Sequence, residues 1–326
     1  MKTVIVLGLM NSGSGAIYDC LASRSDFVAP FGSSEFKFCS APMGLHNLYL
    51  NFYNNFSFFN PSNAIEEFLK YSKKYQDHIV YPTYGNGRKL LKKKIYTIIE
   101  SFIDKISEVS YQGNPEFSNF KINKFEDIFY RITNQKRKFY KIRIPVDKKH
   151  FLKESKILIK KIIKNNLEND YVLTNQHIIL NQASNIFNPF LSSQYFENNK
   201  IIIVTRDPRD IYSSMKNRKS KGSPSYDALL FTKWFKKCFD NDNFKKVLNN
   251  KNLLVINYEN FLNDFKKENK KICQFLKIKE TNKINSNYEK IFDLNKSRES
   301  LYKSKKFLSN MEQNIIKKNL KRFLQW

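Results

Sequence analysis

Three short apolar runs constrain the fold of this chain more than any other feature. They are VIVLGL (4–9), IIIVT (201–205) and LLVI (253–256), and each is rich in β-branched residues. Their apolar residues are continuous rather than alternating, which is typical of strands covered on both faces. Each run is followed by a turn and then by apolar residues at helical spacing. We therefore expect an α/β fold with three layers, in which helices cover a central, mostly parallel sheet.

The segment from about residue 60 to 165 has a different pattern. It is rich in lysine, contains the amphipathic stretches AIEEFLKYSKKY (64–75) and FLKESKILIKKIIKNNL (151–167), and has a turn at YGNGRK (84–89). We expect a single domain over 1–326 that carries this segment as a mostly helical insertion. The tail predicts one more amphipathic helix, with Ser309 or Asn310 as its N-terminal cap.

The chain carries a large excess of positive charge. It has 57 Lys and Arg against 30 Asp and Glu, for a formal charge of +27. Such a charge suits an anionic partner, although lysine, asparagine and isoleucine are frequent throughout, so part of the excess is compositional. No nucleic-acid-binding module is recognisable, so we expect no nucleic acid partner. The alternative is a basic RNA-binding protein. Binding to oligonucleotides that weakens steeply with salt would support it.

Other features bear on compartment and metals. The four cysteines form no CxxC pair and no cluster with histidine, which argues against structural zinc and fits a reduced compartment. No apolar run approaches 18 residues, so we expect no membrane-spanning helix. The sequence predicts a cytoplasmic protein and leaves peripheral contact with a membrane open.

A glycine- and serine-rich turn follows the first apolar run. The turn is Asn11-Ser12-Gly13-Ser14-Gly15, and it lies between a strand and a helix. Backbone N–H groups in such a turn, at a helix N-terminus, form a concave anion site. Gly8 and Gly13 have the spacing of the nucleoside-triphosphate loop GxxxxGK[ST], but Ser14 and Gly15 stand where lysine and a hydroxyl residue belong. A kinase is therefore a weaker alternative, and we expect an anion that needs no metal.

The stretch RDPRD (206–210) follows the second apolar run. Arg206 then lies at the carboxyl edge of the sheet, where open α/β sheets bind ligands. Asp207 is expected to cap the next helix, and Pro208 suits its first turn. Ser214 follows Arg206 by eight residues, so that a cation and a hydroxyl are able to meet on one phosphate. The alternative is a surface network of arginine and aspartate alone.

Taken together, the two stretches resemble the sulfotransferases that use 3′-phosphoadenosine-5′-phosphosulfate (PAPS). In that family a loop of the form G-x-P-[RK]-[ST]-G-[TS]-[TS] holds the 5′-phosphosulfate. A later R-[DN]-P-x-D, with a serine eight residues after the arginine, holds the 3′-phosphate. The residues that match are Gly8, Ser12, Gly13, Ser14, Arg206, Asp207, Pro208, Asp210 and Ser214. NLLVINYENFLNDFKKENKKICQFLKI (252–278) is similar to a third strand, turn and helix of the family.

This resemblance implies a P-loop-like fold and a PAPS-dependent sulfotransferase without a metal. It places Asn11, Ser12, Gly13, Ser14 and Gly15 at the 5′ end of the donor. Arg206 and Ser214 would hold the 3′-phosphate. The basic segment SRESLYKSKKF (297–307) resembles the C-terminal loop that closes over the nucleotide. The acceptor that the resemblance implies is a hydroxyl of a glycan or glycolipid, because many glycan-acting members share a stretch that resembles residues 27–40 here.

The chain departs from the family pattern in the loop. Asn11 occupies the position of a lysine or arginine, Met10 replaces proline, and Gly15 replaces a hydroxyl residue. An amide carries no charge, so a preorganised cation that stabilises the transition state is missing from the loop. Lys37 is a candidate substitute. The alternative is a non-catalytic homologue that binds the nucleotide without turnover.

A base must take the proton of the acceptor hydroxyl. The stretch FVAPFGSSEFKFCS (27–40) resembles a K-E-x-x-F-like stretch of glycan-acting members, in which the glutamate corresponds to Glu35. We therefore expect Glu35 to be the catalytic base. His177 and His46 are rival candidates, because a neutral imidazole suits this role near neutral pH.

Overall fold

The computed structural model describes residues 2–76, 95–113, 124–133, 140–167, 176–220, 222–239, 250–280, 288, 290 and 292–325. The chain divides into two compact units. The first comprises Met1–Cys39, Thr83–Arg88 and Ile163–Trp326, and the second comprises Ser40–Pro82 and Lys89–Ile162. The turn expected at 84–89 lies outside the described residues.

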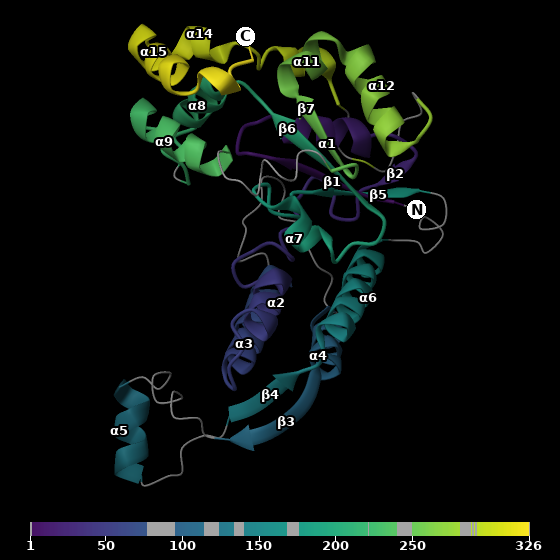
Figure 1. Cartoon of the computed structure of the whole chain (residues 1–326), viewed down its shortest axis with the longest axis vertical. Coiled ribbons are helices and arrows are strands. Elements are labelled where there is room, and N and C mark those ends of the chain that lie inside the picture. Colours follow the sequence, from purple (N-terminus) through teal and green to yellow (C-terminus); the bar gives the residue numbers. More distant parts are fainter. Residues whose placement is uncertain are drawn as a thin grey trace. The chain divides into compact units, whose positions relative to one another are not determined.

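A five-stranded sheet forms the centre of the first unit (Figure 1). Its strands, in spatial order, are β2 (Phe27–Val28), β5 (His177–Asn181), β1 (Thr3–Gly8), β6 (Asn199–Thr205) and β7 (Leu253–Asn257). All neighbouring pairs are parallel. The three strands predicted from the apolar runs are confirmed as β1, β6 and β7. Because β1 pairs with β5 on one side and β6 on the other, the loop after β1 lies at the middle of the carboxyl edge.

Helices surround this sheet, which confirms the expected α/β fold class. They are α1 (Ser14–Ala22), α7 (Pro189–Ser193), α8 (Pro208–Asn217), α9 (Ala228–Phe239), α11 (Tyr258–Asn263), α12 (Phe265–Leu276), α13 (Leu294–Arg298), α14 (Lys303–Phe307), α15 (Asn310–Asn319) and the 3₁₀ turn η3 (Lys321–Phe323). Apolar residues of α1, α11 and α12 pack in one core with Val4, Ile202 and Ile256 of the sheet. Helices α8, α9, α14 and α15 pack together in a second group, apart from α11 and α12 (Figure 1).

Two helix starts were predicted from sequence, and both are confirmed. The Asp207 side chain caps α8 by accepting from the backbone N–H of Arg209, and Pro208 lies in the first turn. Ser309 is the N-terminal cap of α15, where it forms a reciprocal capping box with Glu312. The first of these caps fixes the turn that carries Arg206 into the candidate site.

The second unit is mostly helical. It holds α2 (Leu45–Tyr53), α3 (Asn60–Gln76), α4 (Ile95–Lys105), β3 (Ser107–Gly113), α5 (Lys124–Thr133), β4 (Tyr140–Pro145) and most of α6 (Lys148–Asn166). The helices expected at 64–75 and 151–167 are confirmed as α3 and α6. The antiparallel pair of β3 and β4 was not predicted, because β3 is largely exposed and lacks an apolar pattern. Within the described residues, no helix has the length and apolar character needed to cross a bilayer.

Candidate functional site

The glycine loop joins β1 to α1 through two residues with left-handed backbone conformation. Asn11 has a φ of 63° and Gly13 a φ of 88°. The backbone N–H of Ser12 donates to the carbonyl of Leu9 at 2.9 Å, which closes the turn. Asparagine is one of the few side chains that enter this region of φ at low cost, so Asn11 suits the turn it occupies. At the start of α1 the backbone N–H of Ala16 donates to the carbonyl of Gly13 at 3.0 Å, whereas the N–H groups of Ser14 and Gly15 lie in the first turn, where a helix supplies no partner and an anion is able to accept.

Two glycines of this region are required by close packing, and a third is not. A Cβ atom on Gly8 would lie 2.1 Å from Ser12 Oγ, and one on Gly13 would lie 2.3 Å from the Tyr258 ring. A Cβ atom on Gly15 would meet nothing within 4 Å. The loop is therefore pressed against its surroundings at Gly8 and Gly13, whereas position 15 has open space beside it.

Gln182, at the end of β5, holds the start of the loop. Its side-chain amide brackets Gly8: Oε1 accepts from the Gly8 N–H at 3.3 Å, and Nε2 donates to the Gly8 carbonyl at 3.0 Å. Nε2 also donates to Ser14 Oγ at 3.2 Å. One side chain thus continues the sheet pairing beyond the end of β5 and orients the hydroxyl of Ser14.

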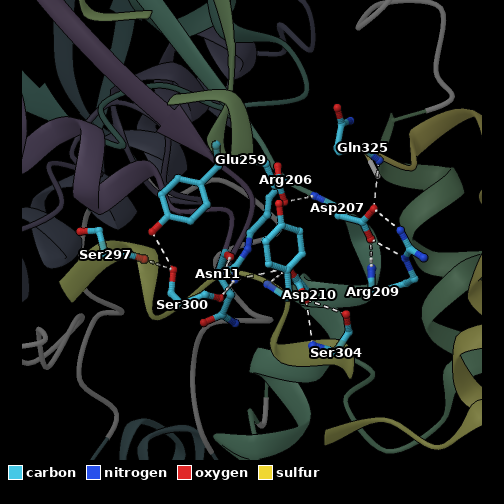
Figure 2. Close-up of polar contacts among 12 residues, drawn as sticks. Asn11, Arg206, Asp207, Arg209, Asp210, Glu259, Ser297, Ser300, Ser304 and Gln325 are labelled. Atoms are coloured by element: carbon cyan, nitrogen blue, oxygen red, sulfur yellow. Dashed lines mark hydrogen bonds and ion pairs between the residues drawn. The ribbon is translucent and has the colours of Figure 1, made fainter. Parts of the chain in front are cut away.

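Arg206 lies directly after β6, against the glycine loop. Its Nη1 donates to the carbonyl of Asn11 at 3.0 Å, and its Nη2 donates to the carbonyl of Ser300 at 2.5 Å. The guanidinium also lies 5.1 Å from the centre of the Tyr258 ring, a cation–π distance. The two anion-binding stretches predicted from sequence are therefore in direct contact, and the 297–307 segment joins them (Figure 2).

Several polar atoms at this junction are buried without a hydrogen-bond partner among the described residues. They are Asn11 Nδ2, Ser12 Oγ and Arg206 Nε. Burying such groups unpaired is unfavourable, so each indicates a missing partner. Ser12 and Arg206 also line a mainly apolar cavity of about 360 Å³. In such surroundings each polar contact to a ligand counts for more than it would in water.

Buried carboxylates surround the arginine side of the site (Figure 2). Asp210 accepts from the backbone N–H groups of Tyr302 and Ser304, each at 2.9 Å, and lies 4.0 Å from Arg206 Nη2. Asp207 pairs with the Arg209 guanidinium at 2.9 Å. Asp210 thus holds the 297–307 segment against α8. Arg206 donates to the carbonyl of Ser300 in the same segment.

A third carboxylate completes this group. Glu259, at the start of α11, accepts from the backbone N–H of Asp207 at 2.9 Å and from Asn257 Nδ2 at 3.0 Å. Burial raises the pKa of Glu259 above its usual value, although the hydrogen bond from Asp207 opposes that shift. Charge on this side is therefore closely balanced between arginines and carboxylates.

Ser214 lies on α8, half-buried, one residue after the fully buried Ser213. Its carbonyl accepts from the backbone N–H of Arg218 at 3.2 Å near the end of the helix. The structure thus places Ser214 on the helix that Arg206 precedes. Its expected contact with a phosphate remains a prediction.

Glu35 lies beside Asn181, at the carboxyl end of β5. It shares this edge of the sheet with the glycine loop, since β5 is the direct neighbour of β1. Lys37 Nζ is 2.5 Å from Glu35 Oε2, so the candidate base and the candidate substitute cation form an ion pair. Both roles remain predictions, and the pair shows that each side chain would orient the other.

The two rival histidines lie elsewhere. His177 begins β5 and its Nδ1 accepts from the backbone N–H of Lys2, which places it at the amino edge of the sheet, opposite the loop. Burial and the nearby Lys2 lower the pKa of His177. This position argues against His177 as a base for an acceptor bound at the loop. His46 is on α2 in the second unit, stacked on Tyr49, and its role remains untested.

The sequence model of the Sulfotransferase family matches residues 97–282, more than half of the chain. The protein therefore belongs to the Sulfotransferase family, as the resemblance implied. The match includes the Arg206 stretch and β7. No curated protein matches the chain in sequence.

The solved structures that match this chain include two sulfotransferase domains and retinol dehydratase. The sulfotransferase domain from the curacin biosynthetic pathway is 13% identical, with 98% of this chain and 96% of that chain covered and a TM-score of 0.44. The sulfotransferase domain of the Synechococcus PCC 7002 olefin synthase is 14% identical, with 95% and 94% covered and a TM-score of 0.40. Retinol dehydratase, solved with retinol and PAP, is 13% identical, with 99% and 83% covered and a TM-score of 0.30.

Sequence reasoning did not identify three residues that shape the site. Gln182 brackets the loop, Tyr258 packs on Gly13 beneath Arg206, and Ser300 supplies a carbonyl to Arg206. The Tyr258 hydroxyl also hydrogen-bonds Ser300 Oγ at 2.9 Å. Tyr258 and Ser300 fall within the stretches 252–278 and 297–307 that resemble the family, but the sequence assigned neither residue a role. Gln182 and Tyr258 also lie at the carboxyl ends of β5 and β7.

Proposed function

We propose that this chain transfers a sulfuryl group from PAPS to a hydroxyl of a glycan or glycolipid. The observation that carries this proposal is the meeting of Arg206 and the glycine loop, with three buried polar atoms left unpaired at their junction. A donor with phosphate groups at both ends of its ribose suits a site with two anion-binding parts. Membership of the Sulfotransferase family supports the same reaction class.

The residues present fit the two ends of such a donor. On the 5′ side we assign the loop Asn11–Gly15, whose backbone N–H groups, with Ser12 Oγ, accommodate an anion at the start of α1. On the 3′ side we assign Arg206 and Ser214. No group of three or more His, Cys, Asp or Glu side chains in the described ranges is arranged to hold a metal.

The reaction supplied by the bound donor is transfer of its sulfuryl group. A bond forms between the acceptor oxygen and sulfur, while the bond from sulfur to the 5′-phosphate oxygen breaks. Glu35 accepts the proton of the acceptor hydroxyl, with Lys37 holding the carboxylate in place. The loop N–H groups stabilise the charge that develops on the departing phosphate. Asn11 contributes hydrogen bonding there without charge.

The experiment is calorimetry with 3′-phosphoadenosine-5′-phosphate (PAP), with and without Mg²⁺, followed by incubation with labelled PAPS and a glycan panel. We expect Mg²⁺-independent binding of PAP and label transfer to a glycan. Binding without transfer to any acceptor would indicate the non-catalytic homologue. Binding of ATP that requires Mg²⁺, with none of PAP, would indicate a phosphotransferase and refute the proposal.

The acceptor class rests on the resemblance around Glu35 and is tested separately. The panel therefore includes an apolar alcohol and a phenol beside the glycans, and transfer to these alone would replace the glycan assignment. We also propose a cytoplasmic location, which the four free cysteines support.

A further inference from the structure

Helix α5 of the second unit presents an apolar face to solvent. Its sequence, KFEDIFYRIT, has apolar residues at 125, 128, 129 and 132, the spacing of one face of a helix. Phe125 is 85% exposed and Ile132 78%, and Ile128 and Phe129 are each 52% exposed. Contiguous apolar surface of this kind usually marks a binding surface. We call these four residues the α5 face.

The charge of the molecule favours one occupant for this face. The chain has a formal charge of +27, and the sequence directly after α5 contains three consecutive basic residues at 136–138. A second copy of the chain would bring the same positive excess to the contact, which opposes pairing. An anionic lipid surface supplies both an apolar layer and the opposite charge.

We propose that the α5 face inserts into the interface of an anionic membrane and holds the protein there peripherally. The helix has ten residues, so its length is about 15 Å, half the thickness of a hydrocarbon core. It is suited to lie in the interface rather than to cross the bilayer. Phe125 near the start of the helix and Ile132 near its end would both insert into the membrane interface. This inference is independent of the proposed sulfuryl transfer.

The test is co-sedimentation of the full chain with phosphatidylcholine vesicles, with and without about 30% phosphatidylserine. We compare the wild type with the double variant Phe125→Glu/Ile132→Glu. The wild type is expected to sediment with the anionic vesicles, and the variant to lose at least about tenfold in partitioning because its apolar area is replaced by charge. High salt should weaken the wild-type interaction.

A matched control places the same charges on equally exposed apolar residues elsewhere. Tyr226 is 80% exposed and Met311 73%, and both lie in the first unit. The double variant Tyr226→Glu/Met311→Glu should retain vesicle binding. Equal loss in both double variants would mean that net charge alone governs binding and would overturn the proposal.

Two further readouts separate the other occupants of the α5 face. A lower unfolding temperature in Phe125→Glu/Ile132→Glu than in the control would show that the chain itself covers the face. A change from a larger to a smaller species in light scattering would show that the face joins two copies. Either result, or equal sedimentation with neutral and anionic vesicles, would overturn the proposal. PAP binding, measured in parallel, should be the same in all variants.

Discussion

The two sides of the candidate site differ in the kind of polar group that they present. On the loop side, Asn11 offers a side-chain amide and Ser12 a hydroxyl, and Gln182 fixes the turn through neutral hydrogen bonds. On the arginine side, Arg206 lies next to Asp210, and Asp210 accepts hydrogen bonds from the 297–307 segment, so charged groups are buried there. The loop side is neutral and depends on geometry, whereas the arginine side depends on charge.

This difference shows how the proposed site would hold an anionic group on each side with cations on one side only. Backbone donors at a helix start are positioned before the ligand arrives, so they stabilise an anion without a compensating side-chain charge. A buried guanidinium needs carboxylates around it, and these also fasten the 297–307 segment over it. Loss of charge on the arginine side should therefore affect affinity, and substitutions of Asn11 or Gln182 on the loop side should affect mainly turnover.

The largest effect is expected from Arg206→Ala. Loss of charge-assisted hydrogen bonds of about 2.7 kcal/mol should weaken PAP binding about 100-fold. Calorimetry measures this change. Arg218→Ala, an exposed position at the end of the same helix, should leave the affinity unchanged. If Arg206→Ala retains both its affinity for PAP and its unfolding temperature, the assignment of the 3′ side is wrong.

A smaller effect is expected from Gln182→Ala. The variant leaves the Gly8 N–H and the Ser14 hydroxyl without their partner, at a cost of about 1–2 kcal/mol in the geometry of the loop. We expect kcat to fall about tenfold, with little change in the KM for PAPS. A fall in stability with unchanged kcat would make Gln182 structural only.

Gln182→Glu serves as the conservative variant. Its ionised carboxylate still accepts from the Gly8 N–H but has no hydrogen to donate to the Gly8 carbonyl or to Ser14. Protonation restores that donor, so its relative activity should rise as the pH falls. A pH profile with the shape of the wild type would contradict this role.

These contacts show which parts of the site the sequence was able to predict. Strands β1, β6 and β7 were predictable, because continuous apolar runs report burial on both faces of a sheet. Strand β5 was not, since its apolar run is only the three residues 178–180, between polar residues at both ends. Arg206 was predictable because it directly follows a buried strand.

The partners of Arg206 were beyond reach for a different reason. Asn11 is 195 residues away in sequence and Ser300 is 94 residues away, and both offer backbone carbonyls, which every residue carries. Such contacts leave no periodic trace in the sequence. The steric need for Gly13 also depends on Tyr258, which only the folded chain brings to it.

The missing loop cation is tested by Asn11→Lys. We expect kcat to rise about fivefold, because a charge is returned beside the departing phosphate. The left-handed backbone at this position should cost about 1 kcal/mol in stability. Steady-state kinetics and thermal unfolding measure the two effects.

The control is Asn11→Gly, which keeps the turn and removes the amide, and so separates the effect of the side chain from that of the backbone. A loss of activity in both variants would mean that the amide itself is required.

Glu259 gives the arginine side a dependence on pH that the loop side lacks. Its pKa is raised by burial, so the folded state binds the proton more tightly than the unfolded state does. Its contribution to stability is therefore full below the ordinary glutamate pKa of about 4.3 and is lost as the pH rises through the raised value. Glu259→Gln should gain stability relative to the wild type over this rise, in denaturation at several pH values. A difference that does not change with pH would contradict the raised pKa.

The smallest effect is expected from Gly15→Ser. Position 15 has no positive φ, and a Cβ atom there meets nothing within 4 Å, so the side chain fits without displacement of the loop. Serine should also stabilise α1 slightly relative to glycine. A hydroxyl in the first turn of α1 adds a neutral donor to the loop side, and we expect PAP affinity to rise about twofold. Gly13→Ser is the matched comparison, since it is blocked by Tyr258 and should abolish binding. If Gly15→Ser is as damaging as Gly13→Ser, the loop side depends on its glycines for a reason other than space.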